Sequence, residues 1–343
     1  MYTHLRPWLF RLDPERAHAL TLSLVRMAGA VPGMCHALRT LLVGEARRSP
    51  VEAFGLVFPN PVGLAAGYDK DGLGWLGLSA LGFGHIEVGT VTLRPQAGNP
   101  RPRLFRLPES GALINRMGFP GQGAQAVSRR LRAARPYGTV LGVNIGKNKD
   151  TPLEEAAQDY LALMEVFSPL ADYLAVNVSS PNTVGLRRLQ ARQALEDLLR
   201  PLVQRKQEFL AQGRRTAPLL VKLAPDLSDQ ELDDALDALV SAGVDGVIAT
   251  NTTLSREGLV SPLSKETGGL SGAPLRERST QMVRAISARA GNKLPVIGVG
   301  GVMCAADALE KLEAGAVLVQ VYTGLVYAGP GLVRSILSGL KAC

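Results

Sequence analysis

Asparagine, lysine and threonine side chains stand at the ends of successive apolar segments of this sequence. They are Lys70, Thr90, Asn144, Asn177, Lys222, Thr250, Asn251, Thr252 and Thr323. A single asparagine in such a place most often caps a helix or turns a loop. Several amides, hydroxyls and ammonium groups that converge would instead bind a flat heterocycle with many donors and acceptors.

The densest polar cluster is the segment 177–183, which reads Asn-Val-Ser-Ser-Pro-Asn-Thr. Ser180 has no histidine or acid nearby in the sequence and no GxSxG elbow, so a hydrolase triad is unsupported. Hydrogen bonding within a turn is an equally good explanation for Ser179 and Ser180.

The two lysines each allow two interpretations. Lys222 could form a Schiff base with a carbonyl substrate, or could hold positive charge beside a reduced flavin or an enolate. Lys70 lies between Asp69 and Asp71, where a weak surface ion pair is the simpler alternative to a binding role.

Glycine turns close the last two apolar segments. Gly300 and Gly301 precede a helical pattern, and Thr323 is followed by Gly324. In barrel proteins this pair of loops commonly binds phosphate through backbone N–H groups, although two ordinary tight turns would have the same sequence. The glycine-rich segment 268–272 could add further N–H donors.

The segments that position these residues predict an α/β protein, a (β/α)8 barrel. Continuous apolar runs rich in β-branched residues are typical of parallel strands buried on both faces. We expect strands at 62–66, 85–91, 140–145, 172–178, 219–223, 246–250, 295–299 and 318–322, and helices that include 152–168, 189–212, 228–242, 275–290 and 305–313. An open doubly wound sheet is less favoured, because the turn at 67–72 is not a GxGxxG fingerprint.

Residues 1–45 differ from the rest of the chain, which we expect to form one domain over 46–343. Apolar residues recur there at helical spacing beside arginines, and a Val31-Pro-Gly33 turn divides the pattern, so we expect a two-helix extension. Two interpretations remain open: a helical cap over the bottom of the barrel, or an amphipathic element at a membrane surface.

Composition narrows the functional class. The 343 residues carry a formal net charge of +8, and residues 1–50 hold seven arginines against three carboxylates. Aromatic residues do not alternate with the basic runs, so we expect no nucleic-acid partner. The three cysteines are far apart, which favours a reducing compartment and predicts no metal site. No apolar run is long enough for a transmembrane helix, and residues 1–10 lack the apolar region typical of a signal peptide, so we expect neither.

Several long motifs resemble one family. The segments 60–72, 98–106, 115–119, 177–183 and 298–301, together with 12–18 near the N-terminus, are similar in sequence and order to class 2 dihydroorotate dehydrogenase. The resemblance implies an FMN enzyme of pyrimidine synthesis that oxidises (S)-dihydroorotate to orotate and reduces a membrane quinone.

Carried over position by position, the resemblance makes Ser180 the catalytic base, and serine rather than cysteine marks the quinone-linked class. The implied substrate contacts are Lys70, Asn115, Arg116, Met117, Gly118, Phe119, Asn177, Asn182, Asn251 and Thr252. The implied FMN contacts are Ala66, Gly67, Tyr68, Asp69, Lys70, Thr90, Asn144, Asn177, Lys222, Thr250, Gly272, Gly301, Tyr322 and Thr323. Thr323 stands where the family commonly has serine, and Tyr68 replaces a usual aliphatic residue.

The resemblance also gives the N-terminal extension a role. We expect it to form a quinone channel lined by His18, Arg106 and Tyr322, with its arginines toward anionic lipid. We therefore expect a monomer held peripherally on the cytoplasmic face of the cell membrane. Thr183 and a water are candidates for a proton relay from Ser180.

Overall fold

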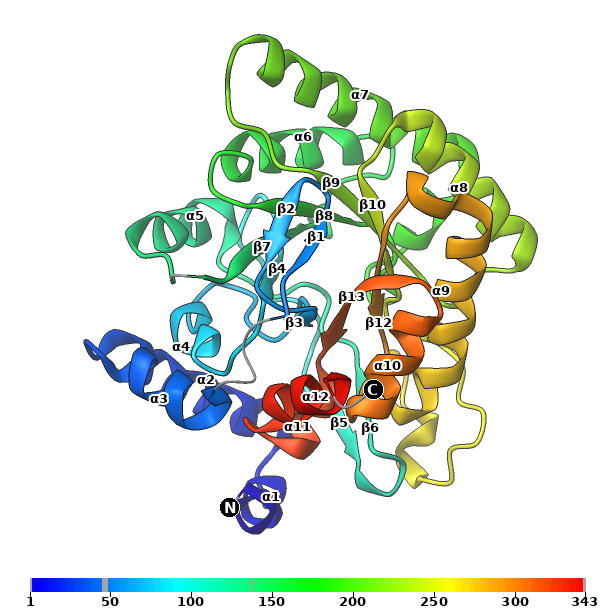
Figure 1. Ribbon diagram of the computed structural model, residues 1–343. Helices are drawn as coiled ribbons and strands as arrows, with labels where there is room; N and C mark the ends of the chain where they lie inside the picture. Colours follow the sequence, from blue (N-terminus) through cyan, green and yellow to red (C-terminus); the bar gives the residue numbers. More distant parts are fainter. Residues whose placement is uncertain (1, 45–48, 137, 342–343) are drawn as a thin grey trace.

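Eight parallel strands form a closed barrel in the computed structural model, which describes residues 2–44, 49–136 and 138–341 (Figure 1). Pairing of the last strand with the first closes the barrel. Its strands, in order around the barrel, are β3 (Val62–Leu64), β4 (His85–Val91), β7 (Val140–Ile145), β8 (Tyr173–Asn177), β9 (Leu219–Leu223), β10 (Gly246–Ala249), β12 (Val296–Val299) and β13 (Ala316–Val321).

Helices cover the outside of the barrel, as the sequence predicts. They are α4 (Trp75–Ser79), α5 (Gly123–Ala133), α6 (Ala156–Phe167), α7 (Arg192–Ala211), α8 (Asp229–Ala242), α9 (Arg276–Ala290), α10 (Ala305–Glu313), α11 (Thr323–Ala328) and α12 (Leu332–Leu340). Helix α8 begins at a complete capping box between Ser228 and Glu231 and ends at Gly243 in the left-handed conformation.

The barrel interior is apolar at one end and polar at the other. Tyr173, Leu220, Ile248 and Leu318 belong to one buried cluster. Side chains two positions apart share a face of a strand, so Lys222 and Gln320 point into the same interior nearer the carboxyl ends, and Thr250 follows the end of β10 at the same level. The apolar layer thus supports a polar layer where barrel enzymes build their active sites.

A short hairpin closes the other end of the barrel. Strands β1 (Val51–Ala53) and β2 (Leu56–Phe58) pair antiparallel, and the Phe58 ring lies 5.4 Å from the His85 ring at the start of β4. This hairpin, rather than the N-terminal helices, covers the barrel bottom, which corrects the helical-cap interpretation.

An antiparallel sheet absent from the sequence prediction stands beside the barrel. Strands β5 (Leu104–Leu107), β6 (Ala112–Asn115) and β11 (Gly269–Gly272) pair in the order β11-β6-β5. The sheet brings two distant segments together and ends with Asn115 paired to Gly269. It therefore carries the segment 115–119 toward the barrel.

The N-terminal segment forms three helices, where the sequence predicted two. They are α1 (Tyr2–Arg11), α2 (Pro14–Ala30) and α3 (Met34–Val43). The missed break lies at Asp13, whose carboxylate accepts hydrogen bonds from the N–H groups of Glu15 and Arg16, and at Pro14, which occupies the first position of α2. The predicted domain boundary at 45/46 lies outside the described residues.

The N-terminal helices pack beside the barrel, against α4, β5 and α11 (Figure 1). The Tyr2 hydroxyl donates to the Val326 carbonyl at 2.6 Å, which ties α1 to α11. Among the described residues, nine of the sixteen large apolar side chains that stay exposed lie between residues 5 and 41. Within the described residues, every helix is too short or too polar to cross a membrane.

Candidate active site

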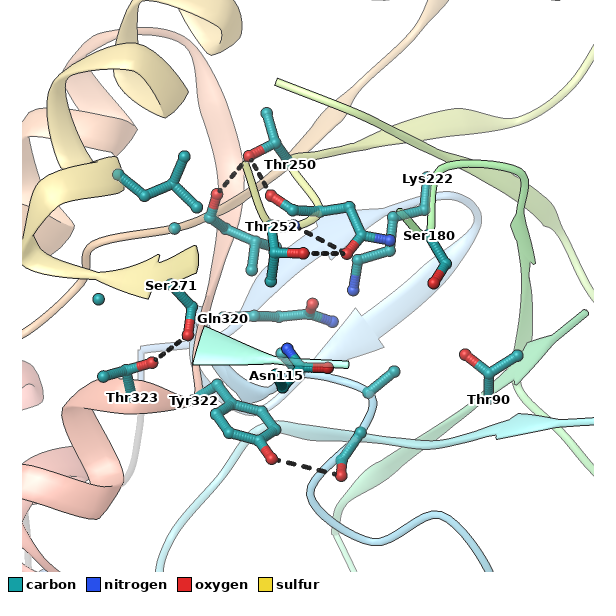
Figure 2. Close-up of a pocket in the computed structure, with 18 of the residues that line it drawn as sticks. Thr90, Asn115, Ser180, Lys222, Thr250, Thr252, Ser271, Gln320, Tyr322 and Thr323 are labelled. Carbon is teal, nitrogen blue, oxygen red and sulfur yellow. Dashed lines mark hydrogen bonds between the residues drawn. The ribbon is translucent and has the colours of Figure 1, made fainter. Parts of the chain in front are cut away.

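A cavity opens at the carboxyl ends of the barrel strands (Figure 2). Nineteen of the residues implied by the resemblance line it: Ala66, Gly67, Lys70, Thr90, Asn115, Met117, Gly118, Phe119, Asn177, Ser180, Asn182, Lys222, Thr250, Asn251, Thr252, Gly272, Gly301, Tyr322 and Thr323. Residues from two long stretches of the chain, 65–119 and 177–324, therefore meet at one place.

The asparagines form an ordered chain of amides. Asn177 Nδ2 donates to Thr90 Oγ1 at 2.9 Å and to Asn144 Oδ1 at 3.2 Å. Asn251 Nδ2 in turn lies 3.3 Å from Asn177 Oδ1. Because each amide is held by its neighbours, the side chains are oriented before any ligand arrives. Asn144 itself lies behind this chain and does not line the cavity.

A buried carboxylate lies beneath the cavity and was not predicted. Glu87 is fully buried, and its carboxylate is 3.6 Å from the Lys222 ammonium. Asn144 Nδ2 donates to it at 2.8 Å and Gln320 Nε2 at 2.9 Å. Tyr173 OH donates at 3.1 Å, and burial followed by the nearby Glu87 charge raises the pKa of Tyr173 well above its usual value. These donors hold the carboxylate, which in turn fixes Lys222.

Gln320 and Ser271 also line the cavity without having been predicted. Gln320 Oε1 is buried and has no hydrogen-bond partner among the described residues, so an acceptor faces this region unsatisfied. A polar residue inside the apolar run of β13 was the available signal for it. Ser271 and Thr323 share a hydrogen bond at 2.9 Å, which links β11 to α11 (Figure 2).

Lys70 lies at the cavity edge on the loop after β3, with Nζ 2.5 Å from the Gly67 carbonyl. Burial, and next the repulsion of the Arg103 guanidinium, lower the pKa of Lys70 to about 8, and Asp71, Glu15 and Asp69 partly offset this. The side chain is therefore a cation held in a poorly solvated place, rather than one half of a surface ion pair.

Ser180 lies on the loop that follows β8 and is 5% exposed. Its Oγ accepts a hydrogen bond from the Asn182 N–H at 3.3 Å. Arg187 fastens this loop, because its Nε donates to the Ser179 carbonyl at 3.0 Å and its Nη2 to the Thr252 carbonyl at 2.8 Å. The hydroxyl is thus held toward the cavity in a nearly dry setting. Thr183 is buried nearby, and its relay role stays a prediction.

Two glycine turns form part of the cavity wall. A Cβ on Gly301 would lie 2.3 Å from the Arg276 Cα, and one on Gly272 would lie 2.3 Å from the Gly111 carbonyl oxygen. Both residues have positive φ. Only glycine allows these two turns to approach their neighbouring backbone this closely, so glycine is required at both positions.

Three other implied residues lie away from the cavity. Asp69 is buried and accepts hydrogen bonds from the Leu73 and Gly74 N–H groups, so it shapes the loop after β3. The Arg116 side chain pairs with Glu266 at 2.5 Å. Tyr68 belongs to the wall of a second cavity.

The second cavity lies between the N-terminal helices and the barrel. His18, Arg106 and Tyr322, the three residues expected along a channel, all line it, with mainly apolar neighbours. Burial, and next the nearby Lys70 charge, lower the pKa of His18 to about 4, so its imidazole is neutral at neutral pH. Tyr322 lines both cavities and its ring lies 5.8 Å from that of Tyr68, so the two cavities meet at this residue.

The closed barrel and the polar cavity at the carboxyl ends of its strands define an enzyme of the (β/α)8-barrel class. The family model described as dihydroorotate dehydrogenase matches residues 49–343. The chain belongs to the dihydroorotate dehydrogenase family, in its quinone-linked class.

Relatives match over nearly the whole chain. A protein of Stenotrophomonas maltophilia (strain K279a) named dihydroorotate dehydrogenase (quinone) is 50% identical, over 99% of this chain and 96% of its own. One of the same name from Azotobacter vinelandii is 51% identical, over 100% and 97%. The crystal structure of DHODH from Eimeria tenella in complex with ferulenol has a TM-score of 0.86 at 38% identity, covering 96% of this chain and 90% of that one.

Proposed function

We propose that this chain oxidises (S)-dihydroorotate to orotate, with FMN in the barrel cavity, and passes the electrons to a membrane quinone in pyrimidine biosynthesis. The observation that carries the proposal is the meeting of Lys70, Ser180 and the asparagine chain in one cavity at the carboxyl ends of the strands. The names of the relatives support both the substrate and the quinone acceptor.

The residues present fit FMN. Gly272 and Gly301 line the cavity and carry no side chain, so their backbone N–H groups would be available to a phosphate. Thr90, Asn177 and Lys222 would hold the ring system, and the unsatisfied Gln320 Oε1 faces the same region. FMN, when bound, supplies a hydride acceptor for C6 of dihydroorotate and hands the electrons on to the quinone.

The substrate is an anionic ring with a carboxylate, two carbonyls and two N–H groups. Lys70 would bind the carboxylate through charge, and Asn115, Asn177, Asn182 and Asn251 would match the ring edges. Asn182 Nδ2 already donates to Asn115 Oδ1 at 3.0 Å, so the amides of two separate loops are aligned with each other.

Ser180 would remove the proton from C5 of dihydroorotate. A serine hydroxyl is a weak base, so this step needs a path for its proton and the exclusion of bulk water. The low exposure of Ser180 and of Thr183, at 5% and 6%, supports this dry setting. Lys222 would stabilise negative charge that develops in the cavity. We adopt this role over a Schiff base because the relatives are named dehydrogenases.

The second cavity would admit the quinone. Its apolar lining suits a quinone ring and tail, and Arg106 is held at its rim by the Leu9 carbonyl, 3.2 Å away. Tyr322 belongs to both cavities, so electrons would have a short distance to cross. We accordingly propose that residues 1–45 form the quinone-access unit and 46–343 the catalytic domain.

The exposed apolar side chains of the N-terminal helices favour a peripheral membrane position. Trp8 is 66% exposed, Met27 57% and Leu41 73%. Such side chains beside arginines bind the interface of an anionic bilayer. We propose that a monomer binds the cytoplasmic face of the cell membrane through these helices, where the quinone pool is within reach.

A flavin titration tests the proposed function. The purified protein should be yellow, and anaerobic dihydroorotate should bleach its visible absorbance while orotate forms in equal amount. A soluble quinone should then restore the colour. A colourless protein, or a flavin that dihydroorotate does not bleach, would contradict the proposal, and trapping of a lysine adduct by borohydride would favour the Schiff-base alternative.

A further inference from the structure

A largely buried arginine forms an ion pair with a partly exposed glutamate and so links helix α2 to the loop that precedes β5. Glu15 and Arg103 have side-chain exposures of 18% and 8%, and Arg103 Nη2 lies 2.7 Å from Glu15 Oε1. Arg103 Nε donates to Glu15 Oε2 at 3.2 Å, so the contact is bidentate. A bidentate guanidinium–carboxylate pair fixes orientation as well as distance.

The same guanidinium also holds the loop 97–99. Arg103 Nη1 donates to the carbonyls of Ala97 at 2.7 Å and Asn99 at 2.9 Å. The position of Asn99 is therefore set by an arginine whose own position is set by Glu15.

Asn99 in turn joins the two loops that we assign to the substrate. Its Nδ2 donates to the Arg116 carbonyl at 3.0 Å and to the Asn182 carbonyl at 3.2 Å. Its backbone N–H donates to the Met117 carbonyl at 2.9 Å. One side chain thus fixes the segment 115–119 and the turn that follows Ser180 relative to each other.

We propose that Glu15 is a positioning residue for dihydroorotate oxidation, acting through Arg103 and Asn99 on the two substrate loops. The inference rests on the proposed function of the barrel cavity. If Glu15 has this role, helix α2, which borders the second cavity, also sets the geometry of the barrel cavity. Removal of the whole N-terminal unit would therefore impair both half-reactions, and point variants are needed to separate them.

The chain offers a matched control for Glu15. Arg101 pairs with the same carboxylate at 2.9 Å from the outer side, with its side chain 72% exposed. Among the described residues it makes no hydrogen bond to the segment 115–119 or to the Ser180 loop. An exposed ion pair contributes little, so Arg101→Gln should behave as wild type.

The test uses the flavin-loaded enzyme without quinone. In anaerobic stopped flow, Glu15→Gln should raise the dissociation constant of dihydroorotate about tenfold, and calorimetry should show a similar loss for orotate, because the loops are no longer aligned. Asn99→Ala, which keeps the Glu15–Arg103 pair, should show the same loss. The double variant should be no worse than Asn99→Ala alone, because the two residues act in series.

The outcomes separate this inference from the proposed function. If dihydroorotate fails to bleach the wild-type flavin, the proposed function is wrong. If wild type is bleached but Asn99→Ala or Glu15→Gln binds dihydroorotate and orotate normally, or if the two losses add, the positioning role is overturned. Should Glu15→Gln not fold, the result with Asn99→Ala alone decides.

Discussion

At the scale of single residues, polar groups inside an apolar barrel carry most of the information. Lys222 and the asparagines could be predicted as site residues because a polar side chain at a buried strand end needs a partner. Glu87 and Gln320 sit within β4 and β13 and carry the same signal, yet the sequence prediction overlooked them. Their partners come from β7, β8 and β9, and only the register of the closed barrel reveals those contacts.

The lowered pKa of Lys70, about 8, gives a pH dependence. A bound carboxylate favours the ammonium form, so the pKa of Lys70 is higher in the complex than in the free enzyme. Affinity for orotate is then full below about pH 8 and falls as the pH rises above it. Between pH 7 and pH 9 we expect about a tenfold loss of affinity by calorimetry. Lys70→Met should bind weakly at both pH values, and a constant wild-type affinity over this range would refute the role of Lys70.

At the scale of elements, the sequence predicts the strands of the barrel better than it predicts the helices of the N-terminal segment. Strands β4, β7 and β9 have the predicted bounds, since continuous apolar runs identify buried parallel strands. The sheet of β5, β6 and β11 was missed because its strands are short and because β11 pairs with β6 across more than 150 residues. The break between α1 and α2 was missed because the apolar spacing continues across Asp13 and Pro14, where local capping decides the structure.

The N-terminal helices should bind anionic vesicles through exposed apolar side chains. Trp8 and Met27 are 66% and 57% exposed, and Val57 and Val260 elsewhere are 63% and 85% exposed. Trp8→Glu with Met27→Glu should lower binding to phosphatidylglycerol vesicles about tenfold or more, because apolar area is lost at the interface. Val57→Glu with Val260→Glu adds the same charge and should bind nearly as wild type. Equal losses in the two pairs, by vesicle cosedimentation, would exclude a specific membrane face.

At the scale of the whole molecule, the proposed function places dihydroorotate oxidation in the barrel cavity and quinone reduction in the second cavity. One opens among the loops at the carboxyl ends of the strands and the other between the barrel and the N-terminal helices, and Tyr322 lines both. Half of the net charge of +8 lies in residues 1–50, which hold seven arginines against three carboxylates. The fold could be predicted from the repeated strand and helix pattern, whereas the contact between Glu15 and Arg103 joins residues 88 positions apart and required the structure.

Reduction of the flavin by dihydroorotate in the Ser180→Ala variant tests the central claim most directly. Without the hydroxyl no base is placed at C5, while the groups assigned to FMN remain, so the variant should bind FMN normally. In anaerobic stopped flow its flavin should be reduced slower than wild type by about two orders of magnitude or more. Near-normal reduction by the variant would contradict the assignment of Ser180 as the base.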